Sequence, residues 1–204
     1  MFIHKNLYVL GFAAVIATQI TATPIPSMRE IYTSLPQDQL PIISSKTGHA
    51  LSSEEKLKLI KLEDQSNGYH ELAGNEDTDA FSAGQIVLFK LKTGSFLVGV
   101  RAEFGDSATG LVMLDRNGNG WRDVTKNILP LLTNEMVDRR TQEKIPAFKK
   151  IHRKVSDCAS GTYAYALPRV GTVIEVIVNS DCYAGKRVVL WHLPFDGKAF
   201  VLKP

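Results

Sequence analysis

The stretch Gln85-Ile-Val-Leu-Phe-Lys-Leu91, Lys92-Thr-Gly94, Ser95-Phe-Leu-Val-Gly-Val-Arg101 gives the clearest structural signal in the chain. Two runs rich in β-branched and aromatic residues flank a short turn that ends in glycine, which is the pattern of a β-hairpin. A second hairpin is predicted further on, where residues 110–114 and 121–125 flank the turn Asn117-Gly-Asn-Gly120. The centre of the chain is therefore predicted to consist of antiparallel strands.

The C-terminal part of the sequence continues this pattern. Strands are predicted at residues 163–167, 172–178 and 186–192, and an Asp-Gly turn leads into a last strand at 199–203. Each predicted strand is short and ends near a glycine, an asparagine or a proline, as in a sheet made of consecutive hairpins.

Helices are predicted at two places. Ser52 and Glu55 form a capping box, which predicts a helix of two to three turns that runs through Ile60. Residues 126–150 are the least strand-like part and are predicted to contain a short helix and a loop. The predicted fold class is mainly β, an α+β domain with one short N-terminal helix, built as an antiparallel meander of successive β-hairpins.

The N-terminus has the pattern of a secretory signal peptide. Residues 1–22 combine a short basic start, an uncharged apolar stretch at 7–17 and small residues at the end, and cleavage is predicted after Ala22. The apolar stretch is shorter than the about 20 residues that span a bilayer, so we expect no transmembrane segment in the mature chain. Residues 23–50 are rich in Pro, Ser and Thr and are predicted to form an extended leader that is not a packed element. Residues 51–204 are predicted to form a single β-rich domain.

Composition excludes several classes of protein. The 204 residues are 44% hydrophobic and 22% charged, and the formal net charge is +3. This is the composition of a globular domain and excludes a disordered tail, a fibrous repeat and a disulfide-dense miniprotein. The small net charge also argues against nucleic acid as a partner, because nucleic-acid-binding domains are usually much more basic.

The two cysteines, Cys158 and Cys182, both lie in the mature chain. In an exported protein an isolated pair usually forms one disulfide, which is the preferred interpretation. The alternatives are a catalytic thiol and a metal-binding pair, but the spacing is not that of a CxxC motif.

The string Asp115-Arg-Asn117-Gly-Asn119-Gly-Trp-Arg-Asp123 resembles the calcium loops of dockerin-like and integrin-propeller repeats, with Asn119 where those loops have aspartate. Oxygen ligands at alternate positions around a tight glycine turn suit a hard cation. The candidate ligands are Asp115, Asn117, Asn119 and Asp123. The same string also makes a hairpin turn without metal, because Asn and Gly tolerate positive φ. The metal-free turn is the preferred interpretation. No cofactor is therefore predicted, with calcium as the alternative.

Two segments of the chain carry opposite charge. Residues 63–79 contain six acidic residues and no Lys or Arg, whereas residues 138–154 contain seven basic and two acidic residues. One interpretation is a solvated loop at each place; the other is a basic patch that binds an anionic partner. The candidate contact residues of that patch are Arg139, Arg140, Lys149 and Lys150.

Several short motifs occur in an order that resembles a family of uncharacterised secreted bacterial proteins. They are an NGY element at 67–69, an LFK hairpin at 88–94, a W-x-D-V-T segment at 121–125, an LPR-x-GT segment at 167–172 and a DGK-x-F hairpin at 196–200. The resemblance covers roughly residues 52–203. It implies an exported β-rich domain and assigns no activity and no functional residues. His70 departs from the leucine that is usual after NGY.

These observations predict a function only in outline. The histidines lack zinc-site spacing and no nucleophile elbow or phosphate loop is present, so no catalytic residue is assigned and an enzyme is not preferred. We expect a non-catalytic binding or interaction protein, periplasmic or secreted, whose partner is an unknown protein or an anionic envelope component. Two alternatives stay open. One is a calcium-stabilised secreted module that uses the Asp115–Asp123 loop, and the other is a cell-envelope polysaccharide hydrolase.

Overall fold

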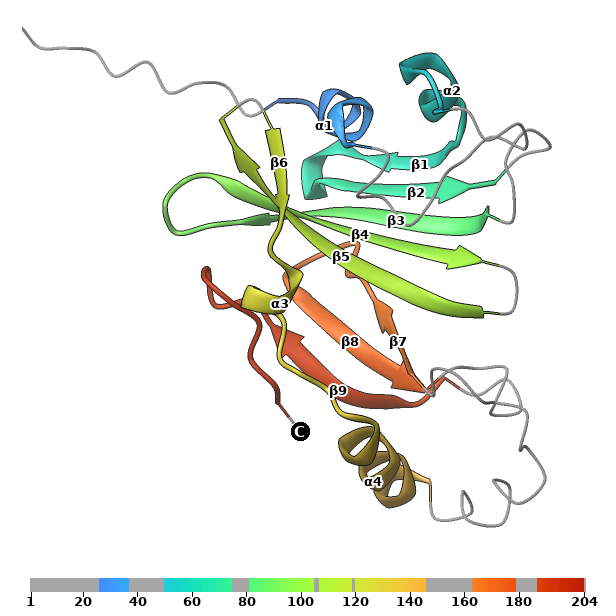
Figure 1. Ribbon diagram of the computed structural model, residues 1–204, viewed down its shortest axis with the longest axis vertical. Coiled ribbons are helices and arrows are strands. Elements are labelled where there is room, and N and C mark those ends of the chain that lie inside the picture. Colours follow the sequence, from blue (N-terminus) through green and yellow to red (C-terminus); the bar gives the residue numbers. More distant parts are fainter. Residues whose placement is uncertain are drawn as a thin grey trace, which may run out of the picture.

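The computed structural model describes residues 26–36, 50–74, 81–104, 107–118, 120–145, 163–178 and 187–203. The first half of this structure contains two short helices followed by a six-stranded sheet (Figure 1). Its elements are α1 (Met28–Ser34), α2 (Ser53–Lys58), β1 (Ile60–Asp64), β2 (Tyr69–Ala73), β3 (Phe81–Lys90), β4 (Phe96–Phe104), β5 (Ser107–Asn117) and β6 (Gly120–Asp123). The second half comprises α3 (Thr125–Ile128), α4 (Asn134–Lys144), β7 (Tyr163–Ala166), β8 (Val173–Val178) and β9 (Val189–Pro194).

The strands form two antiparallel meanders. In the larger sheet the order is β1-β2-β3-β4-β5-β6, and in the smaller sheet it is β7-β8-β9. The hairpin predicted around Lys92-Thr-Gly94 is β3–β4, in which Phe89 pairs with Leu97 and Leu91 N donates to Ser95 O at 2.9 Å. The second predicted hairpin is β5–β6. The prediction of a mainly β, antiparallel meander is confirmed.

The six-stranded sheet is covered on both faces (Figure 1). Side chains alternate between the two faces along each strand, so neighbouring residues contribute to different cores. Val87 and Phe89 on β3 belong to the core that includes residues of β8, β9 and the C-terminal segment, whereas Ile86 belongs to the core that includes α1 and residues around α2. The molecule therefore has three layers: helices, the large sheet and the small sheet.

The C-terminal segment packs against the large sheet without forming the strand predicted at 199–203. Phe200 pairs with Phe195, Lys203 pairs with His192, and both are isolated bridges. Phe200 N donates to Ile128 O at 2.9 Å, so the hydrogen bonds of the segment go to different elements in turn and no continuous ladder forms. The rings of Phe195 and Phe200 lie 5.7 and 5.0 Å from that of Phe89.

The prediction for residues 23–50 is wrong where the structure describes this segment. Residues 28–34 form helix α1, which begins with a capping box between Ser27 and Glu30. Its buried apolar side chains recur at helical spacing on one face, and they are Met28, Ile31, Tyr32 and Leu35. The prolines at 26 and 36 flank this helix and do not interrupt it. Residues 26–36 are therefore a packed element and not part of an extended leader.

The helix predicted from Ser52 is α2, and its capping box with Glu55 is present. It ends at Lys58, two residues earlier than predicted, because Ile60 already pairs with Leu72 as the first residue of β1. In residues 126–150, α4 is longer than the short helix predicted there. Among the described residues, no helix has the length and apolar character needed to cross a membrane.

Candidate partner-binding surface

Four loops meet at one end of the two sheets, and we call this surface the loop end. It comprises residues 64–68, 91–95, 167–172 and 195–199. Hydrogen bonds connect the loops in pairs: Arg169 Nε donates to Asp64 Oδ2 at 2.9 Å, Phe195 N to Thr172 O at 3.0 Å and Lys92 N to Gly197 O at 3.2 Å. The loop end is thus one continuous surface built from residues that are far apart in the sequence.

The close approach of two of these loops depends on Gly197. Its φ is +91°, and a Cβ at this position would lie 2.6 Å from Cγ of Lys92. A side chain here would be strained by the backbone and would also collide with Lys92. The glycine of the predicted DGK-x-F hairpin therefore lets the C-terminal turn pack against the β3–β4 turn.

A polar cluster beneath the surface holds the 167–172 loop. Gln85 Oε1 accepts hydrogen bonds from Leu167 N and from Arg101 Nη1, both at 3.3 Å. Gln85 Nε2 donates to Tyr69 Oη at 3.1 Å. Burial raises the pKa of Tyr69, so its hydroxyl stays neutral and can accept this bond. The cluster connects strands β2, β3 and β4 to the loop that follows β7.

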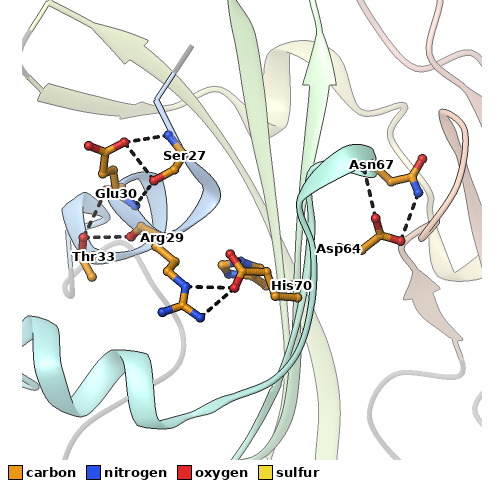
Figure 2. Close-up of polar contacts among 8 residues, drawn as sticks. Ser27, Arg29, Glu30, Thr33, Asp64, Asn67 and His70 are labelled. Atoms are coloured by element: carbon orange, nitrogen blue, oxygen red, sulfur yellow. Dashed lines mark hydrogen bonds and ion pairs between the residues drawn. The ribbon is translucent and has the colours of Figure 1, made fainter. Parts of the chain in front are cut away.

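Asp64 holds the same loop from the other side. Its carboxylate accepts from Ser66 Oγ at 2.8 Å, from Asn67 N at 3.3 Å, from Asn67 Nδ2 at 3.0 Å and from Arg169 Nε. Figure 2 shows the two contacts between Asp64 and Asn67. These hydrogen bonds, led by that from the Asn67 side chain, keep the pKa of Asp64 far below its usual range. Asp64 therefore stays ionised and fixes the position of the Arg169 guanidinium.

The exposed charge of the loop end is positive. Lys92, Arg169 and Lys198 are exposed, while Asp196 is the only exposed acidic residue of the four loops. Asp196 Oδ1 already accepts from Lys198 N at 2.8 Å and Ala199 N at 2.9 Å. These backbone hydrogen bonds lower the pKa of Asp196 and satisfy its carboxylate within the turn. The surface therefore offers more cationic than anionic groups to a partner.

Apolar side chains are exposed beside these cations. Val170 is 72% exposed and Val173, three residues later, is 38% exposed. Val173 pairs with Pro194, whose carbonyl accepts from the amide of Val201, itself 44% exposed. The loop end thus continues into a strip of exposed valines along one side of the small sheet.

A second polar cluster is buried between α1 and the large sheet. His70 is completely buried, and its Nε2 lies 3.3 Å from Oε1 of Glu63 (Figure 2). Within the described chain neither ring nitrogen makes a well-directed hydrogen bond. Arg29 holds the Glu63 carboxylate through Nε at 2.9 Å and Nη2 at 2.8 Å. Burial lowers the pKa of His70, and no substrate can reach it, so this cluster is structural.

The two carboxylates among the candidate calcium ligands, Asp115 and Asp123, are not brought together. Asp115 pairs with Arg122 across the β5–β6 ladder and forms an ion pair with it at 2.9 Å. Asp123 pairs with Leu114, so it lies on the opposite face, and its Oδ1 accepts from Thr125 N at 2.8 Å. Asn117 lies opposite Gly120, and Asn119 is outside the described residues. Among the described residues, no group of three or more His, Cys, Asp or Glu could hold a metal.

The candidate basic residues differ in their surroundings. Arg139 is exposed on α4, whereas Arg140 donates through Nε to Leu190 O at 3.1 Å and through Nη1 to Glu143 at 2.9 Å. Arg140 thereby holds α4 against the backbone of β9. Lys149 and Lys150 lie outside the described residues.

Three acidic residues of the 63–79 segment form ion pairs within the domain. Glu63 pairs with Arg29, Asp64 with Arg169 and Glu71 with Lys61. In the described parts of the two segments, no ion pair joins residues 63–79 to residues 138–154. Both cysteines, Cys158 and Cys182, and the signal peptide at 1–22 lie outside the described residues.

Comparison with known proteins gives no match. No family model, no curated protein and no solved structure matches this chain. The resemblance to secreted bacterial proteins therefore stays a prediction. Sequence patterns do not indicate the loop end, although the LPR-x-GT motif forms part of it.

Proposed function

We propose that this chain is an exported, non-catalytic binding protein that binds an acidic protein partner through the loop end. The signal-peptide pattern at residues 1–22 supports export to the periplasm or beyond. The observation that carries the proposal is the combination of exposed cations on four loops held together by hydrogen bonds with three exposed valines, of which Val170 lies on these loops and Val173 and Val201 lie beside them.

Each property of this surface suits binding. Exposed cations attract an acidic partner and orient it during the encounter. Exposed apolar side chains beside them can be buried in the complex, where they contribute affinity. The hydrogen bonds between the loops fix the surface before binding, so less conformational entropy is lost. We propose the loop end in place of the 139–154 segment, because the side chain of Arg140 is only 19% exposed, whereas that of Arg169 is 56% exposed.

The test is capture of partners by mature residues 23–204 from native periplasmic and secreted fractions, followed by affinity measurement with each purified candidate. The loop-end variant carries Lys92→Glu, Arg169→Glu and Lys198→Glu. The matched control carries Lys126→Glu, Arg139→Glu and Lys144→Glu, three exposed cations outside the loop end, so the change in net charge is the same. Thermal unfolding of both variants establishes that they fold.

We expect an acidic protein that binds the wild type and the control but not the loop-end variant. Loss of the partner in the control alone would place the binding surface on the α3–α4 side and contradict the proposal. Equal binding by all three proteins would also contradict it.

A further inference from the structure

Arg169 and Val170 form the tip of the loop between β7 and β8. The side chain of Arg169 is 56% exposed and Val170 is 72% exposed. In the described chain only four large hydrophobic residues are exposed, and three of them are Val170, Val173 and Val201, which lie along this side of the small sheet. The tip therefore presents a cation and an apolar group side by side.

The tip is fixed at its start, its middle and its end. Leu167 N is bonded to Gln85 Oε1, Arg169 Nε to Asp64 Oδ2, and Thr172 O to Phe195 N. Between them, Gly171 has a φ of +87°, which lets the chain turn sharply after Val170. Exposed side chains on so constrained a backbone lose little freedom when a partner binds, which favours a binding hot spot.

The contact between Arg169 and Asp64 also orients the guanidinium. Asp64 bonds Nε, and in the described chain no hydrogen bond from the two Nη groups of Arg169 is formed. A guanidinium presents paired N–H donors that match the two oxygens of a carboxylate. Val170 follows directly and provides an apolar contact next to that pair.

We infer that Arg169 and Val170 are the hot spot of the loop end, and that they bind a protein segment in which a carboxylate lies beside an apolar side chain. This inference rests on the proposed function and adds the chemistry of the partner. It distinguishes the tip from the other cations of the loop end, Lys92 and Lys198, which would contribute mainly to the encounter.

The test follows backbone amide signals of isotope-labelled mature chain by NMR while short capped peptides are added. One peptide has a glutamate next to a leucine, a second has glutamine in place of the glutamate, and a third has serine in place of the leucine. We expect the first peptide to shift the amide signals of Leu167 and residues 169–172, and each of the other two to bind at least about threefold more weakly. Equal shifts with all three peptides, with acetate alone, or only outside the loop end would overturn the inference.

Two pairs of variants complete the test, since each change at the tip has a counterpart on the same surface. Arg169→Gln is matched by Lys198→Gln, and Val170→Ser by Val201→Ser. We expect the tip variants to weaken binding of the first peptide, and of any captured partner, about tenfold, and their counterparts less than about threefold. If the partner is lost in the triple loop-end variant but the tip variants equal their counterparts, the inference fails while the proposed function stands. If the triple variant still binds, the proposed function fails.

Discussion

The two faces of the six-stranded sheet are closed in different ways. On one face, the side chains of β3–β5 pack against β8, β9 and the C-terminal segment, with Phe89, Phe195 and Phe200 in mutual contact. On the other face the cover is α1, together with residues around α2. Lys56 and His70, two of the three buried polar residues of the described chain, both contact the helix on this second face.

This difference indicates which part of the molecule responds to its surroundings. A helix as short as α1 is not stable alone, so its order depends on packing and on the groups that anchor it. Two of its anchors, Lys56 and His70, are ionisable groups removed from water. We call the face of the sheet that packs around Phe89 the aromatic face, and the face covered by α1 the helical face. We expect the aromatic face to set global stability and the helical face to respond first to pH and to loss of polar contacts.

The largest effect is expected on the aromatic face. Phe89→Ala removes a completely buried ring that contacts two others and leaves a cavity, which should cost about 3–5 kcal/mol of unfolding free energy. Denaturant unfolding measures this loss. Leu131→Ala is the control, because Leu131 is 83% exposed, and it should change stability by less than about 0.5 kcal/mol. Similar losses for both variants would contradict the assigned core.

Removing the buried ammonium group should loosen the helical face. Lys56 Nζ donates to Leu35 O at 2.9 Å and Thr33 O at 3.2 Å, at the C-terminal end of α1. Lys56→Met leaves these carbonyls without a donor and should cost about 1–3 kcal/mol. Relative to the wild type, Lys56→Met should accelerate hydrogen exchange more in α1 than in β3. Lys58→Met, which removes an exposed ion pair with Glu54, should cost no more than about 0.5 kcal/mol; an equal cost would refute the anchoring role.

Acidification should also act on the helical face first. The groups that face His70 are Glu63 from β1 and Tyr32 and Arg29 from α1. Burial lowers the pKa of His70, so the unfolded chain binds a proton at a higher pH than the folded chain does. Neutral His70 therefore makes its full contribution to the free energy of unfolding above about pH 6.5. This contribution is lost as the pH falls, by at most about 1.4 kcal/mol per pH unit.

Chemical unfolding between pH 7.5 and 5 of wild type, His70→Leu and His192→Leu measures this effect. We expect the free energy of unfolding to fall with pH in the wild type and in His192→Leu, because His192 is exposed. The free energy of unfolding should depend less on pH in His70→Leu. Glu63, whose pKa is lowered mainly by Arg29, loses its contribution only at a lower pH. A slope that survives in His70→Leu would show that another group is responsible.

The smallest effect compares two helix starts with the same capping box. Ser27→Ala at α1 and Ser52→Ala at α2 each remove a side-chain acceptor for a backbone amide, which typically costs about 1 kcal/mol. The two variants should lose similar free energy by denaturant unfolding. Hydrogen exchange should separate them, with faster exchange confined to α1 in the first and around α2 in the second. Unchanged exchange in both would refute the role of these caps.

Local signals explain what could be predicted. The hairpins β3–β4 and β5–β6 follow from apolar strands and turn residues that are neighbours in the sequence. The capping box at Ser52 likewise predicts where α2 begins. The helix α1 was missed because the segment around it, residues 23–50, is rich in Pro, Ser and Thr, although the apolar residues of the helix have helical spacing. The strand β1 was missed because its apolar residues follow those of a helix without a break.

The candidate site could not be predicted in this way. Asp64 and Arg169 are 105 residues apart, and only the packing of the two sheets brings them into contact. A related effect separates two candidate calcium ligands: spacing places Asp115 and Asp123 in one loop, but the pairing of β5 with β6 directs them to opposite faces. The string Asp115–Asp123 is a hairpin whose carboxylates are used for an ion pair and a backbone hydrogen bond.

Local patterns therefore predict the class of fold, the order of most strands and their turns, because these depend on periodicity and on the backbone preferences of nearby residues. The packing of the folded chain sets which elements cover each face of the large sheet and which loops meet at its end. These features depend on contacts between residues far apart in the chain, whose free energies no local pattern encodes.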